Sequence, residues 1–117
     1  MQYIPAPHPT TDLNILGTSL TTIYTPNANR RPILCSAVLC NTHSGAATVD
    51  LVVNDGTTDY YLLEGHSLTA SETYVFKGEE KNFIALETTW TVKAKSNTDA
   101  VVHCTLNLLE TEGRKVT

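Results

Sequence analysis

Apolar and polar residues alternate along most of this chain with a period of two, which is the spacing of β-strands and not of helices. In residues 90–95, Trp90, Val92 and Ala94 alternate with threonine and lysine, so these three side chains are expected to face a core. Residues 100–110 alternate in the same way, with Val102, Cys104, Leu106 and Leu108 on one face. Both segments therefore predict strands that are buried on one side.

Residues 31–54 predict two further strands joined by a loop at Thr42–Gly45. In the first strand, residues 33–41, both faces are mostly apolar or small, which suggests a central strand covered on both sides. In the second strand, Val49, Leu51 and Val53 form one apolar face. Because the loop residues favour turns, we expect the two strands to pair as a β-hairpin.

Turn signals divide the rest of the chain at short intervals. The strongest is Asn54-Asp55-Gly56, which precedes a strand-like segment at residues 59–63. Further strands are expected at residues 20–24, 73–76 and 83–87. About eight short strands without any helical period predict an all-β fold, a single antiparallel β-sandwich or jelly-roll-like domain.

Residues 1–17 differ from the rest because proline occupies every second position from Pro5 to Pro9. This spacing excludes a helix and favours an extended conformation. One interpretation is an arm that lies on a neighbouring subunit, and the other is a leader that packs on its own domain. The residues expected to make the arm's contacts are Tyr3, Ile4, Pro5, Pro7, Leu13 and Ile15. The predicted organisation is an arm at 1–17, a β-sandwich domain at 18–110 and a polar tail at 111–117.

Charge excludes several classes of partner. Charged residues make up 17% of the chain, the formal net charge is −4, and no basic run exceeds Arg30-Arg31. A nucleic-acid-binding surface needs clustered basic residues, so nucleic acid is not an expected partner. No apolar run approaches the roughly 20 residues that cross a bilayer, and no signal peptide is recognisable. We therefore expect no membrane association.

No arrangement of reactive side chains predicts an active site. Three cysteines are present, and Cys35 and Cys40 are expected on opposite faces of one strand. A disulfide from either one to Cys104 is possible, but buried free thiols are the expected state. The four histidines have no spacing that suits a metal site, and no nucleophile elbow or phosphate loop is present. The expectation is a protein without catalytic residues, metal or cofactor.

Tyr60 and Tyr61 allow one alternative, a ligand platform for a sugar with His66 and Trp90 nearby. Against it, Trp90 is expected to point into the core, and one of the two tyrosines is expected to point inward as well.

The order of these signals resembles the small all-β virion proteins of tailed bacteriophages. The resemblance covers residues 18–110 and rests on strand and turn segments with an Asn-Thr corner, not on a catalytic signature. Its segments are TTIYTPNA (21–28), ILCSAVLCNT (33–42), GAATVDLVV (45–53), YYLL (60–63), LTASETYVF (68–76) and WTVKAK (90–95). The usual Tyr-Thr-Val-Pro is Tyr-Thr-Pro here, at residues 24–26, which moves that turn by one residue.

The resemblance implies a non-enzymatic virion protein that assembles in a host cytoplasm. Within that class it favours a capsid decoration or cement protein that binds the major capsid protein as a homo-oligomer, with a trimer favoured. The alternatives are an accessory component of the neck, tail, baseplate or fibre, and a carbohydrate- or receptor-binding β-sandwich module.

Overall fold

The computed structural model describes residues 8–26, 30–77, 84–87 and 89–112, which form nine β-strands and no helix. The strands are β1 (His8–Ile15), β2 (Thr21–Tyr24), β3 (Arg30–Asn41), β4 (Ala47–Asn54), β5 (Asp59–Leu68), β6 (Thr73–Lys77), β7 (Ile84–Ala85), β8 (Thr91–Ser96) and β9 (Val102–Glu112). All strand pairs are antiparallel. The predicted all-β class is confirmed.

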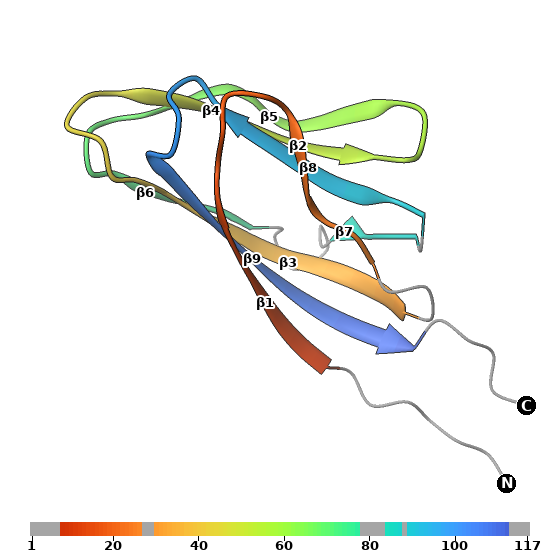
Figure 1. Ribbon diagram of the computed structural model, residues 1–117. Coiled ribbons are helices and arrows are strands. Elements are labelled where there is room, and N and C mark those ends of the chain that lie inside the picture. The colour runs from red at the N-terminus through yellow and green to blue at the C-terminus, as the bar shows by residue number, and fades with distance from the viewer. Residues whose placement is uncertain (1–7, 27–29, 78–83, 88, 113–117) are drawn as a thin grey trace, which may run out of the picture.

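The strands form two sheets that pack face to face (Figure 1). The five-stranded sheet has the order β1-β9-β3-β6, with β7 pairing beside β3, and the four-stranded sheet has the order β2-β8-β4-β5. All but one of the connections between β1 and β6 cross from one sheet to the other, as does the turn between β8 and β9. This alternation of sheets along the chain gives a jelly-roll sandwich.

The core lies between the two sheets and consists of aliphatic side chains. Leu34, Ala37 and Leu39 of β3 contribute to it, and Val102, Cys104, Leu106 and Leu108 of β9 do so from the same sheet. The four-stranded sheet contributes Val49, Leu51 and Val53 of β4 and Val92 and Ala94 of β8. The faces predicted from alternation in β4, β8 and β9 are confirmed.

A polar contact joins the sheets near the β1 end of the core. The Tyr24 hydroxyl, from the four-stranded sheet, donates to the Glu110 carboxylate of β9, which also accepts a hydrogen bond from Thr10 Oγ1 at 3.0 Å. These bonds satisfy polar groups at the margin of the core, where unpaired groups would be costly.

The predicted hairpin at residues 31–54 is wrong. β3 pairs with β6, β7 and β9, whereas β4 pairs with β5 and β8 in the other sheet, so the Thr42–Gly45 loop is a corner between sheets. Asn41 holds this corner. Its buried side-chain amide donates to the carbonyl oxygens of Gly45, Leu68 and Thr69, and its Oδ1 accepts from the His43 N–H. Alternation cannot separate a hairpin from such a corner, because both join two strands through a polar loop.

β3 is also covered on one face only. A bulge between Leu34 and Ser36 changes its alternation, so that Leu34 points into the core while Ser36 and Val38 point outward. The bulge adds one residue to the strand and reverses the faces of all residues after it. The expectation of a strand buried on both sides was therefore wrong.

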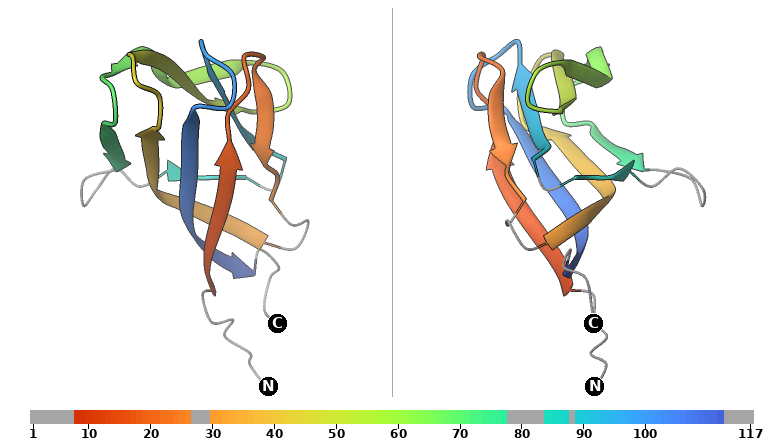
Figure 2. Two further views of the ribbon diagram at one scale, coloured as in Figure 1. Left: turned by 60° about the vertical axis from the view of Figure 1, so that its left-hand side comes forward. Right: turned by 90° about the vertical axis from the view of Figure 1, so that its right-hand side faces the viewer.

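The segment before residue 18 includes a strand of the sandwich. Residues 8–15 form β1, which lies beside β9 of the same chain and pairs with it (Figure 2). Leu16, the next residue, is buried in the core. This placement differs from the expected boundary between arm and domain at residue 17. Residues 1–7 and 113–117 lie outside the described residues.

Candidate docking surface

The apolar side chains of β1 point away from the core of the sandwich. Its register with β9 places Asp12 and Asn14 beside Leu106 and Cys104, whose side chains face the core. The residues that alternate with them point outward, and of these Leu13 is 76% exposed and Ile15 is 64% exposed. An edge strand with a polar inner face and an apolar outer face gains little from its own core, so its outer face is suited to contact with another surface.

The outward residues of the neighbouring strands continue this surface across the sheet. Strand register gives three rows across β1, β9, β3 and β6: Ile15, His103, Cys40 and Thr73; Leu13, Thr105, Val38 and Val75; and Thr11, Asn107, Ser36 and Lys77. We call these residues the neutral face. Lys77 is the one Lys, Arg, Asp or Glu among them.

The neutral face is partly hollowed at its β1 side. A groove of about 340 Å³ is lined by Leu13, Asn14, Ile15, His103 and Thr105. Val75, on the opposite side of the face, is 48% exposed. In the third row, Asn107 Nδ2 donates to Ser36 Oγ at 2.9 Å, so this polar pair satisfies part of its own hydrogen-bonding capacity. Such a surface can be removed from water at low desolvation cost.

The outer surface of the four-stranded sheet has the opposite character. Lys93 Nζ lies 3.9 Å from Asp59 Oδ1, and Lys95 Nζ lies 3.8 Å from Asp50 Oδ2. We call these four residues, with Tyr61 and Thr22 in the Lys93 row, the charged face; the same row contains Val52, whose side chain is fully buried. Charges that already form pairs in water lose hydration when covered, so this face is the less suited of the two to burial against a partner.

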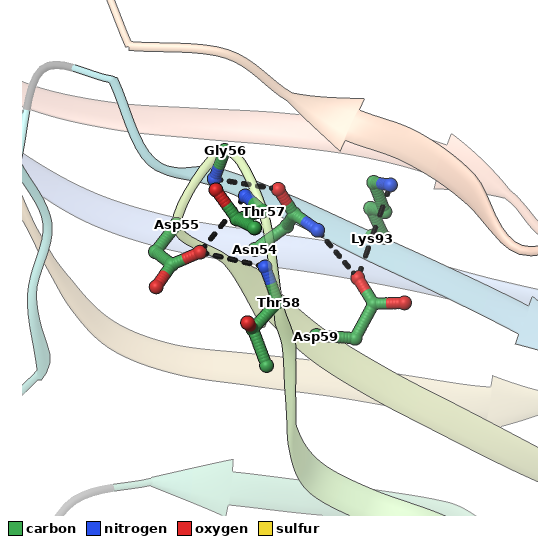
Figure 3. Close-up of polar contacts among 7 residues, drawn as sticks. All are labelled: Asn54, Asp55, Gly56, Thr57, Thr58, Asp59 and Lys93. Carbon is green, nitrogen blue, oxygen red and sulfur yellow. Dashed lines mark hydrogen bonds and ion pairs between the residues drawn. The ribbon is translucent and has the colours of Figure 1, made fainter.

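The turn that ends the charged face is held by side chains (Figure 3). Asp55 Oδ1 accepts from the N–H groups of Thr57 and Thr58, at 2.9 and 2.7 Å, and Asn54 Nδ2 donates to Asp59 Oδ1 at 2.6 Å. The backbone hydrogen bonds from Thr58 and Thr57 lower the pKa of the Asp55 carboxyl. Gly56 adopts a positive φ of 100°, which confirms the turn predicted at Asn54-Asp55-Gly56.

Tyr60 and Tyr61, the residues of the alternative ligand platform, are neighbours in β5. Tyr60 follows the inner row of β5 and Tyr61 the outer row, since they pair with Val53 and Val52. Both are about half exposed, at 54% and 47%. Tyr60 lines an apolar pocket of about 340 Å³ with Val53, Asp55, Leu62, Ile84 and Trp90. Trp90 is partly buried against the core, and His66 stacks with Tyr74 at a ring-centroid distance of 4.2 Å.

The other residues singled out in the sequence are placed as follows. Of the expected arm contacts, Leu13 and Ile15 lie on the neutral face, while Tyr3, Ile4, Pro5 and Pro7 are outside the described residues. Val38, Val75 and Thr105 were missed as surface residues. For Val38, the signal that could have found it is the apolar character of both faces of residues 33–41.

The cysteines are free, and burial raises the pKa of the Cys104 thiol to about 12, with a further contribution from the negative charge of Asp12. In the part of the chain that the structure describes, no three His, Cys, Asp or Glu side chains are grouped to hold a metal ion. None of its segments is a helix long and apolar enough to cross a membrane.

Searches by sequence found no relative: no protein-family model and no curated protein matches this chain. Comparison of the fold with solved structures did find similar chains, several of them from virus particles. A chain from the acid-stable capsid structure of Helicobacter pylori bacteriophage KHP30 matches with a TM-score of 0.61 and 11% identity, over 100% of this chain and 95% of that one.

Two further chains have the same fold. One comes from a virus-like particle of the extra small virus of the giant freshwater prawn Macrobrachium rosenbergii, with a TM-score of 0.55, 11% identity and coverage of 95% of this chain and 81% of that one. The other comes from the T13 particle of infectious bursal disease virus, with a TM-score of 0.56 and 12% identity; it covers 95% of this chain, which spans about a third (32%) of that one. These likenesses establish a shared fold.

Proposed function

We propose that this chain is a non-enzymatic structural protein of a virion, and specifically a capsid decoration protein that attaches to the shell through its neutral face. The observation that carries the proposal is the contrast between the two outer surfaces. One carries a single charged residue, Lys77, over four strands and has Leu13, Ile15, Val38 and Val75 among its side chains, whereas the other carries two ion pairs. A flat, neutral sheet face fits attachment to a large partner surface.

The fold comparisons support a virion role. The bacteriophage KHP30 chain is nearly as short as this one, since the alignment covers 95% of it, so a jelly roll of this length occurs as a separate polypeptide in a phage capsid. The resemblance of residues 18–110 to small virion proteins of tailed phages points to the same class. The expected partner is the major capsid protein, and the expected site of assembly is a host cytoplasm.

Attachment in many copies reduces the energy that each site must supply. A decoration protein that is itself oligomeric binds several subunits of the shell at once, and the second contact is then intramolecular. Each neutral face therefore needs only modest affinity. Residues 1–7 would extend the contact as an arm, as the sequence predicts for Tyr3, Ile4, Pro5 and Pro7.

The test is cosedimentation with shells assembled from the major capsid protein of the same genome. Val75→Lys places a charge in the neutral face, and Tyr61→Lys places the same charge on the charged face, at a residue of equal exposure (48% and 47%). We expect Val75→Lys to weaken binding about tenfold or more, because the added charge must be desolvated, and Tyr61→Lys to bind as wild type. If the two variants bind equally well, the neutral face is not the site of attachment.

A second candidate function is glycan binding at the pocket of Tyr60 and Trp90. Aromatic rings beside a carboxylate suit a sugar ring, and Asp55 lines the pocket. Trp90 is the single tryptophan of the chain, so its fluorescence reports on this pocket alone. A saturable change on titration with soluble oligosaccharides, lost in Tyr60→Ala, would favour this function over decoration; an unchanged spectrum would exclude it for those sugars.

A further inference from the structure

The free edge of β1 has unpaired backbone groups at defined positions. The Leu16 N–H donates to the Val102 carbonyl oxygen at 2.9 Å, in the same register as the β1–β9 pairs. Because residues of an antiparallel strand alternate in the direction of their N–H and C=O groups, Asn14 and Asp12 also bond toward β9. The backbone groups of Thr11, Leu13 and Ile15 then point to the free edge. Among the described strands, β1 pairs with β9 alone.

We propose that this edge pairs with the β1 edge of a second copy of the same chain, antiparallel and centred on Leu13. In this register Leu13 lies opposite Leu13 of the partner, and Thr11 lies opposite Ile15. All three free N–H groups of each strand then face a carbonyl oxygen. A register centred on residue 12 would form as many backbone bonds, but it would place Asp12 directly opposite Asp12 of the partner, where two like charges destabilise the pair.

The side chains on the inner face support the same register. Asn14 Nδ2 is buried and has no hydrogen-bond partner among the described residues. With Leu13 on the two-fold axis, Asn14 of each copy lies directly opposite Asp12 of the other, in a non-hydrogen-bonded pair whose side chains are close. Once the Asn14 side chain turns from its buried position toward the edge, the Asp12 carboxylate of the other copy can accept from its amide, twice by symmetry. The pairing thus supplies a partner for a group that a single chain leaves without one.

The pairing also buries apolar side chains on the outer face of β1. Among the described residues, Leu13 and Ile15 are the two most exposed of the large apolar side chains, and this pairing packs them against Leu13 and Thr11 of the partner. The resulting interface is self-complementary, as a two-fold interface must be. It also covers a long edge strand whose free backbone groups would otherwise favour aggregation.

The two-fold axis of such a pair is perpendicular to the sheet, so both neutral faces lie on the same side of the dimer. This arrangement joins the two five-stranded sheets into one and doubles the surface proposed for attachment, although the pairing itself does not depend on that function. It replaces the trimer favoured from the sequence with a dimer.

The pairing is tested by the mass of the purified protein under reducing conditions, by light scattering after size exclusion, from about 1 μM to about 1 mM. Wild type is expected to reach twice the mass of one chain. Leu13→Pro is expected to stay at the mass of one chain with a native circular dichroism spectrum, because the Leu13 N–H makes no bond within the chain. A wild-type mass of one or of three chains overturns the proposal.

A charge pair tests the register and does not depend on the proline variant. Leu13→Lys and Leu13→Glu each place two like charges together at the axis, and each is expected to be monomeric alone. An equal mixture is expected to double in mass, because Lys then faces Glu. Thr22→Lys, on the edge strand of the other sheet, is the matched control and is expected to dimerise as wild type. If either Leu13 variant dimerises alone, or the mixture stays monomeric, the register is wrong.

Discussion

Asn41 decides how the chain passes from one sheet to the other. Its side chain is fully buried, and its amide bonds reach the corner that it begins and the connection that follows β5. These groups are far apart in the sequence, so the residue joins two connections that would otherwise be held only by their own backbones. The sequence marked Asn41-Thr42 as a corner by resemblance, but the reason for asparagine is visible only in three dimensions.

Replacement of Asn41 by alanine is expected to lower the free energy of unfolding by about 3 kcal/mol, because it leaves buried carbonyl groups without donors. Asn107→Ala is the matched control, since Asn107 is half-buried and donates to Ser36. We expect Asn107→Ala to lower the free energy of unfolding by about 1 kcal/mol. Urea unfolding of both variants measures the difference, and equal losses would mean that the corner is not held by this side chain.

Cys104 gives a prediction on pH. Its pKa in the folded protein is about 12, against 9.0 for an unperturbed thiol, chiefly because it is buried. Above pH 9 the unfolded chain loses this proton while the folded chain keeps it, so the contribution of the thiol to stability falls as pH rises from 9 to 12. Cys104→Ala removes this pH-dependent contribution of the thiol to the free energy of unfolding. Wild type is therefore expected to lose more stability than the variant over this range in urea unfolding, and parallel losses would contradict the assignment.

At the scale of the element, β1 is the segment for which the sequence prediction and the structure differ most: the sequence predicts an arm, and the structure has a strand of the sandwich. The alternation of β4, β8 and β9 predicted their buried faces correctly, because a continuous core selects apolar residues at every second position. The prolines from Pro5 to Pro9 separated this segment from the sandwich in the sequence, and the apolar residues of β1 lie on its outer face, so they gave no core pattern to oppose that interpretation. The bulge in β3 had a similar effect, since one inserted residue reverses the faces without a signal in composition.

Two truncations distinguish the contribution of β1 from that of residues 1–7. Deletion of residues 1–17 removes β1 and the buried Leu16, so we expect it to destabilise the fold strongly. Leu16→Ala alone is expected to lower the free energy of unfolding by about 2–5 kcal/mol. Deletion of residues 1–7 leaves β1 in place, so we expect unfolding as in the full chain but weaker binding to shells. Urea unfolding and cosedimentation measure the two effects. Unchanged binding of the shorter deletion would exclude an arm at residues 1–7.

At the scale of the whole molecule, the two outer surfaces of the sandwich differ in what they offer a partner. The charged face keeps its ion pairs in water, and the neutral face and the β1 edge present apolar side chains and free backbone groups. The charge of the sequence argued against a nucleic-acid-binding surface, but it did not locate any contact surface. That place depends on strand order, which sets distant residues such as Leu13 and Val75 in one row.

A neutral contact also predicts a weak response to salt. Binding to shells is expected to change by less than about threefold between about 50 mM and 500 mM NaCl, because no ion pair needs to form at the neutral face. Attachment through the charged face would weaken steeply over the same range. Cosedimentation at both salt concentrations, with the Val75→Lys variant beside wild type, distinguishes the two.

The most direct test of attachment through the neutral face is a cryo-electron microscopy reconstruction of shells with this protein bound. We expect density for the jelly roll with its five-stranded sheet turned toward the shell, so that Leu13, Val38 and Val75 are covered and Lys93 and Lys95 face solvent. A reconstruction with the four-stranded sheet against the shell, or with both outer faces exposed, would contradict this mode of attachment.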